Sequence, residues 1–166
     1  LSIRARQVHV HLFDGYWEDI GTIRAFYDAN LALASDNPPF DLFDDSAPIY
    51  TRPRFLSPTR ILDARVRNSM LAQGSLIESG VVIENCVIGL RTQIGRNAEI
   101  RDSIIMGVDR YDNGTNGGTP QGIGENSVIR GAIIDKGCRI GRGVRIEPRE
   151  GLEPDCDIKG VHVRDG

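Results

Sequence analysis

The sequence has 166 residues, of which 40% are hydrophobic and 26% charged, a composition typical of a soluble globular protein with one or two domains. Its net charge of −3 argues against a dedicated nucleic-acid binder, and it has no run of 18 apolar residues that could span a membrane. We therefore expect neither nucleic acid nor a membrane among its partners.

Residues 1–34 predict a strand, a loop and a helix. Residues 7–13, QVHVHLF, alternate polar and apolar side chains as a strand does. Asp14-Gly15 marks a turn, and Thr22 is a suitable N-cap for a helix over residues 23–34. Five residues of that segment fall at helical spacing, and Leu33 adds to the apolar face; the five are Ile23, Phe26, Tyr27, Asn30 and Leu31. Since the strand has no partner nearby, we expect the chain to begin inside a larger fold.

Residues 35–60 have the composition of a linker. Five of the eight prolines fall between residues 35 and 59, and proline excludes both helix interiors and central strands. The pattern predicts an extended connector that packs on its neighbours through its large apolar side chains. These are Phe40, Phe43, Ile49, Tyr50 and Phe55.

A short repeat organises the rest of the chain. Isoleucine or leucine recurs in steps of six, six and five residues, so that three successive steps make one coil. Neither a helix nor an alternating strand has this period, whereas a hexapeptide β-helix does. Each aliphatic anchor is expected to point to the axis, with Gly, Asn and Asp at the corners. The anchors are residues 71, 77, 83, 88, 94, 100 and 105, then 123, 129, 134, 140 and 146.

Two segments depart from the repeat. Residues 106–122 are rich in Gly, Asn and Asp and predict a loop excursion at a corner of the solenoid. Residues 157–166 resemble a further strand, and we expect the solenoid to continue beyond them. The three cysteines, Cys86, Cys138 and Cys156, have neither an even count nor metal-ligand spacing, so we expect reduced thiols. Cys86 and Cys138 are interpreted as small core or corner residues.

Several long motifs occur in the order found in one enzyme family. They are GYWEDIGTI at 15–23, SAPIYTRPRFLSP at 46–58, SIIMGVD at 103–109, GIGEN at 122–126 and AIIDK at 132–136. The chain closely resembles the C-terminal portion of glucose-1-phosphate adenylyltransferases, also called ADP-glucose pyrophosphorylases, of the plant and cyanobacterial type. The resemblance implies a mainly β fold, a left-handed parallel β-helix over residues 61–166. It also implies that residues 1–34 are the last strand and helix of an α/β nucleotidyltransferase domain.

The resemblance implies a reaction for the complete enzyme. ATP and glucose 1-phosphate give ADP-glucose and pyrophosphate for glycogen or starch synthesis, with Mg²⁺ as the cofactor. Asp19 corresponds to a catalytic, metal-binding carboxylate of the family, although an Asp after a turn is usually a local backbone cap. The family's nucleotide loop and sugar-phosphate lysine have no counterpart here, so we expect this chain alone to be inactive.

A basic region suggests a second site. Residues 130–149 contain six basic and two acidic side chains, which a solvated surface explains in large part. In the family, phosphorylated metabolites and inorganic phosphate regulate the enzyme, which is a homo- or hetero-tetramer of the bacterial cytoplasm or the plastid stroma. The resemblance assigns effector binding to Arg52, Arg54, Asp135, Lys136 and Arg164, with Arg52 standing where relatives commonly have Gln.

Two other functions remain open from the residues. A hexapeptide-repeat acyltransferase uses the same helix but needs a His between coils as general base, and His9, His11 and His162 all lie outside the main ladder. A stand-alone β-helix could instead serve as a scaffold or oligomerisation module, because flat solenoid faces and open ends associate readily.

Overall fold

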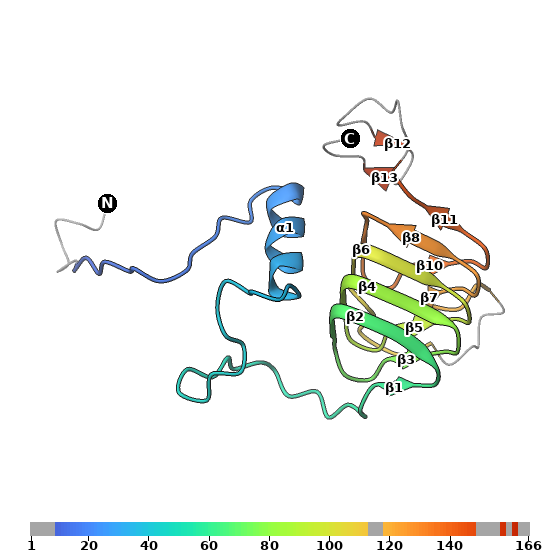
Figure 1. Cartoon of the computed structure of the whole chain (residues 1–166), viewed down its shortest axis with the longest axis horizontal. Helices are drawn as coiled ribbons and strands as arrows, with labels where there is room; N and C mark the ends of the chain where they lie inside the picture. Colours follow the sequence, from blue (N-terminus) through green and yellow to red (C-terminus); the bar gives the residue numbers. More distant parts are fainter. Residues whose placement is uncertain (1–8, 113–117, 149–156, 159–160, 163–166) are drawn as a thin grey trace.

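The parallel strands of the protein form a β-helix, shown in a computed structural model that describes residues 9–112, 118–148, 157–158 and 161–162 (Figure 1). One sheet has the order β1 (Arg60–Ile61), β3 (Leu76–Ile77), β5 (Gln93–Ile94), β7 (Gly122–Ile123) and β10 (Arg139–Ile140). The other has the order β11 (Arg145–Ile146), β8 (Val128–Arg130), β6 (Glu99–Ile105), β4 (Val81–Ile88) and β2 (Ala64–Leu71). Strand β9 (Ile133–Ile134) pairs with β6 beside β8.

The register of the strands confirms that three steps of the repeat make one coil. Ile77 pairs with Ile94, and Ile83 pairs with Ile100, so each anchor stacks on the third anchor after it. Ile94 pairs with Ile123, which is again the third anchor along, although the excursion lengthens the chain between them. The excursion therefore inserts residues at a corner without changing the stack, as a solenoid allows.

The anchors form the core. Those of the inner coils are almost completely buried, from 0% to 8% exposed, and they pack in one cluster. Leu71, Ile140 and Ile146 are only partly buried because the end coils are covered on one side. The buried anchors are Ile77, Ile83, Ile88, Ile94, Ile100, Ile105, Ile123, Ile129 and Ile134.

The five-residue step of the repeat has a backbone cause. Strands β2, β4 and β6 each continue through a corner in which one residue has a positive φ, namely Asn68 (42°), Asn85 (54°) and Asp102 (45°). Asn and Asp tolerate this left-handed conformation better than other non-glycine residues. In the next coil Gly131 (φ 60°) takes the same place between β8 and β9. Asn85 Nδ2 also donates to Asp102 Oδ1 at 2.7 Å, which links two corners.

Helix α1 (Ile23–Leu33) packs against the outside of β4 and β6 (Figure 1). Thr22 caps it as predicted, with its hydroxyl accepting from the Ala25 N–H at 3.0 Å. The Tyr27 hydroxyl donates to the backbone carbonyl of Asp102. Ile104 lies outside the core cluster of anchors yet is only 3% exposed, and it pairs with Ile133 of β9. Within the described residues, no helix is long and apolar enough to cross a membrane.

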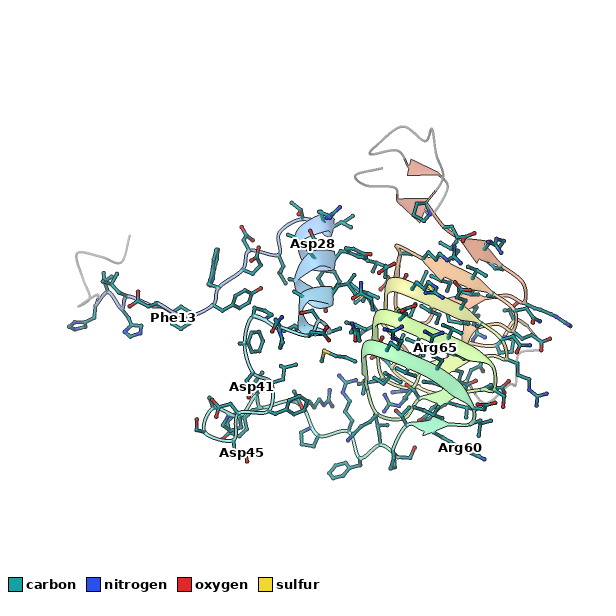
Figure 2. All side chains as sticks on the ribbon, in the orientation of Figure 1. Phe13, Asp28, Asp41, Asp45, Arg60 and Arg65 are labelled. Carbon is teal, nitrogen blue, oxygen red and sulfur yellow. The ribbon has the colours of Figure 1, made fainter. Side chains whose placement is uncertain are left out.

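The predicted strand over residues 7–13 is wrong for its described part. Residues 9–13 form no strand, and Phe13 lies on an extended segment that runs away from α1 (Figure 2). A strand needs a neighbour for its backbone hydrogen bonds, and the described residues place none beside this segment. Residues 1–8 lie outside the described part of the chain.

The linker has no helix or strand between residues 35 and 59, but its predicted packing is mostly wrong. Phe40 lies against Tyr16, with ring centroids 5.7 Å apart. Asp41 and Asp44 cap local turns in this segment, and the other large side chains stay exposed, including Phe55 beside Arg54, which does reach the β-helix. Their exposures are 90% for Phe43, 56% for Ile49, 92% for Tyr50 and 99% for Phe55.

The C-terminal segment differs from the expected single strand. Strand β12 (Asp157–Ile158) pairs with β13 (Val161–His162) in an antiparallel sheet of two short strands. The parallel ladder therefore ends at β11 within the described residues.

Candidate anion-binding site

Two of the predicted effector residues meet at one carboxylate. Arg54 Nη1 lies 3.9 Å from Asp109 Oδ1, and Lys136 Nζ lies 3.3 Å from the same oxygen. Arg54 comes from the linker before β1, Asp109 from the start of the excursion after β6, and Lys136 from the corner after β9. The side chains remain accessible, with 38% of Arg54, 68% of Asp109 and 52% of Lys136 exposed.

The stacking of coils brings Asp109 and Lys136 together. Ile105 pairs with Ile134, which places the residues after β6 beside the residues after β9. The Gly137 N–H then donates to the Gly107 carbonyl at 2.9 Å. The repeat of three steps per coil, once the insertion is accounted for, is thus the sequence feature that could have predicted this contact.

Asp135 supports Lys136 through the backbone. Its Oδ1 accepts from the Lys136 N–H at 2.7 Å, which fixes the turn that carries the lysine. Arg52 is exposed, and the described residues offer it no ion-pair partner, so the structure does not bring it to Asp109. Arg164 lies outside the described residues.

The excursion is held at its base by contacts that sequence reasoning missed. The Val108 N–H donates to the Leu90 carbonyl at 2.9 Å, and the Tyr111 hydroxyl donates to the Gly74 carbonyl at 2.7 Å. The Arg91 guanidinium lies 5.7 Å from the centroid of the Tyr111 ring, within the range of a cation–π contact. The short repeat did not indicate the two contacts of Tyr111, because its side chain lies outside the aliphatic anchors.

Most of the described basic residues from Arg130 onward are neutralised by partners. Arg130 pairs with Glu99 at 2.5 Å and Glu147 at 3.1 Å, and Arg142 pairs with Glu125 at 2.9 Å. Hydrogen bonds from Arg101 and then Arg130 hold the pKa of Glu99 below its usual value. Arg145 pairs with Glu147, and Arg139 with Asp112, both at 2.6 Å. The excess positive charge predicted for this region is thus largely compensated within the fold.

Asp19 occupies an exposed turn before α1. Its Oδ1 accepts from the Gly21 N–H at 3.1 Å, as the backbone-cap interpretation requires. The described residues contain no group of three His, Cys, Asp or Glu side chains that could hold a metal ion. Mg²⁺ is usually bound by one or two carboxylates together with phosphates and water. Asp19 therefore fits the role of one ligand, and the described residues do not form a complete magnesium site.

Cys86 is a core residue, as its place in the repeat predicted. It is 0% exposed, and burial raises the pKa of its thiol to about 11, so it remains protonated near neutral pH. Its N–H donates to the Ser69 hydroxyl at 3.0 Å, one coil away. Cys138 is partly buried and packs against the same core.

The fold and the site define a hexapeptide β-helix in which two cations, Arg54 and Lys136, lie near one carboxylate oxygen of Asp109. A family model described as the GLGC left-handed parallel β-helix domain matches residues 54–166, which confirms the fold class and supplies the handedness. Since the match covers more than half of the chain, the protein belongs to the glucose-1-phosphate adenylyltransferase family. The matched residues are that family's C-terminal β-helix domain.

Proposed function

We propose that this chain is the regulatory portion of an enzyme that makes ADP-glucose and pyrophosphate from ATP and glucose 1-phosphate. Its β-helix binds a phosphorylated metabolite or inorganic phosphate and contributes to a tetramer. The convergence of Arg54 and Lys136 on one oxygen of Asp109 is the observation that carries this proposal.

The chemistry of the two cations suits a phosphate. The guanidinium of Arg54 can bind two phosphate oxygens in one plane, and the ammonium of Lys136 adds a point charge. The two side chains come from segments far apart in the sequence and meet at an accessible surface. A ligand that binds there would connect the linker to the β-helix.

Asp135 would hold the lysine in place during binding, through its contact with the Lys136 N–H. We include Arg52 and Arg164 as further cations for the effector, on the basis of the family resemblance. In the whole enzyme, Asp19 would supply one ligand to Mg²⁺, which neutralises the phosphates of ATP when bound. The Gly21 N–H restrains the carboxylate that would face the metal.

Effector titration of a whole enzyme that contains this chain tests the proposal. Lys136→Ala removes one charge-assisted contact and should raise the effector concentration for half-maximal response by about tenfold. Arg142→Ala is the matched control, because Arg142 is also an exposed, ion-paired cation of the β-helix, but its partner is Glu125 and not Asp109. An unchanged response for Lys136→Ala, or an equal loss for Arg142→Ala, would refute a dedicated effector site.

A further inference from the structure

Asp109 occupies the position between two cations where an anionic ligand would bind. Among the described ion pairs, it is the acidic residue that Arg54 and Lys136 share. Asp135 is adjacent to Lys136 in sequence, but its Oδ1 contacts the backbone N–H. A phosphate that binds both cations must therefore replace contacts that Asp109 already makes.

We propose that Asp109 is an intramolecular competitor of the phosphate ligand and lowers the affinity of the anion site. This inference rests on the proposed function, because it concerns the same two cations. Without ligand, the carboxylate neutralises one of the two positive charges. A phosphate dianion brings two negative charges and can displace it. Half-saturation of the site would then require a higher phosphate concentration than it would if Asp109 were absent.

The geometry allows Asp109 to leave without movement of the backbone. The neighbouring residues are fixed on both sides, by the hydrogen bond from Val108 to Leu90 and by that from Tyr111 to Gly74. The side chain of Asp109 itself is 68% exposed, so rotation about its own bonds can place the carboxylate in water. Displacement costs the two ion pairs and little else.

The expected effect is modest because the ion pairs are exposed. Pairs of this kind contribute little to stability, so removing the competing charge should tighten phosphate binding by about two- to fivefold. The effect should shrink as the ionic strength rises, since exposed charges are screened.

Calorimetric titration of this chain with inorganic phosphate provides the test. Asp109→Asn keeps the shape of the side chain and should lower the dissociation constant by about two- to fivefold. Asp28→Asn is the control, because it removes the same charge from an exposed ion pair with Arg24 on α1. Lys136→Ala should weaken binding, and adding Asp109→Asn to it should give a smaller gain than in the wild type.

The outcomes separate this inference from the proposed function. Equal or weaker binding by Asp109→Asn, together with weaker binding by Lys136→Ala, would overturn the competitor and leave the anion site standing. Absence of phosphate binding in the wild type and in Asp109→Asn would remove the anion site and this inference with it. Asp109→Ser also removes the charge and should lower the dissociation constant in the same way, with an unchanged circular dichroism spectrum. A gain seen only for Asp109→Asn would overturn the competitor.

Discussion

The Tyr27 hydroxyl on α1 donates a hydrogen bond to the backbone carbonyl of Asp102 at a corner of the β-helix. This bond joins residues 75 positions apart and connects the one helix of the described chain to β6. Burial, and secondarily the negative charge of Asp102, raise the pKa of Tyr27. The hydrogen bond itself requires the neutral form of Tyr27, because only the protonated hydroxyl can donate.

Tyr27→Phe should weaken this attachment. Loss of one hydrogen bond of this kind costs about 0.5–1.5 kcal/mol, and urea unfolding followed by circular dichroism would measure it. Tyr50→Phe is the matched control, because Tyr50 is 92% exposed and should show no change. Since the folded pKa of Tyr27 is raised, its contribution is complete below the unfolded pKa near 10 and is lost as the pH rises through the folded value. Equal alkaline sensitivity of the wild type and Tyr27→Phe would contradict this account.

Truncation of a core anchor should depend on its place in the stack. Ile100 is 0% exposed with coils on both sides, whereas Ile134 is 8% exposed near the end of the ladder. Ile100→Ala should cost about 3–5 kcal/mol and Ile134→Ala about 2–3 kcal/mol, because an end coil can relax into its cavity. Lys136→Ala, an exposed change in the same coil, should stay within about 0.5 kcal/mol. Equal losses at Ile100 and Ile134 would show that the end coil is as rigid as the centre.

The repeat made the β-helix predictable because one residue type at a fixed step determines both burial and register. The twelve anchors, the corner residues and the insertion after Ile105 could all be located in this way. The prediction of a strand at residues 7–13 was wrong for its described part. Alternation shows only that a segment suits a sheet and not that a neighbouring strand exists. The predicted packing of the linker was wrong for a similar reason. The apolar character of Phe43 and Phe55 does not determine whether other residues cover them.

The corner at Asn85 should favour glycine over alanine. Its φ of 54° is strained for a residue with a Cβ, and Asn relieves this in part by its contact with Asp102. Since both substitutions remove that contact, their difference reports the backbone alone. Asn85→Ala should be about 1 kcal/mol less stable than Asn85→Gly in urea unfolding. At Gln93, in strand β5 without a positive φ, the order should reverse.

The candidate site was only half predictable. The family resemblance named Arg54 and Lys136, and both lie near one oxygen of Asp109, Lys136 through the stacking of coils and Arg54 from the linker. Asp109 was missed as a site residue because its role depends on an insertion whose length breaks the simple repeat. Arg52 was named by the same resemblance but does not reach Asp109, because a position in a motif does not determine where a linker side chain lies.

The ion pairs around Glu99 predict that the free energy of unfolding decreases at acidic pH. Hydrogen bonds from Arg101 at 2.7 Å and Arg130 at 2.5 Å lower its pKa from 4.5. The contribution is therefore present above pH 4.5 and is lost as the pH falls through the lower folded value. Glu99→Gln should cost up to about 1 kcal/mol at pH 7, and the gap should close in strong acid. Glu18→Gln, an exposed change before α1, should show no such gap, and a gap that persisted in acid would exclude the ionic explanation.

Asp19→Asn in a whole enzyme that contains this chain separates the metal role from the cap. Asparagine keeps the oxygen that accepts from the Gly21 N–H, so the turn before α1 should survive while the charge is lost. If Asp19 is a ligand of Mg²⁺, kcat should fall about 10²-fold or more with an unchanged melting temperature, as when one electrostatic stabiliser is removed. Asp14→Asn, the same change in the same exposed segment, should leave kcat unaltered. If kcat for Asp19→Asn stays within about threefold of the wild type, Asp19 serves the turn alone.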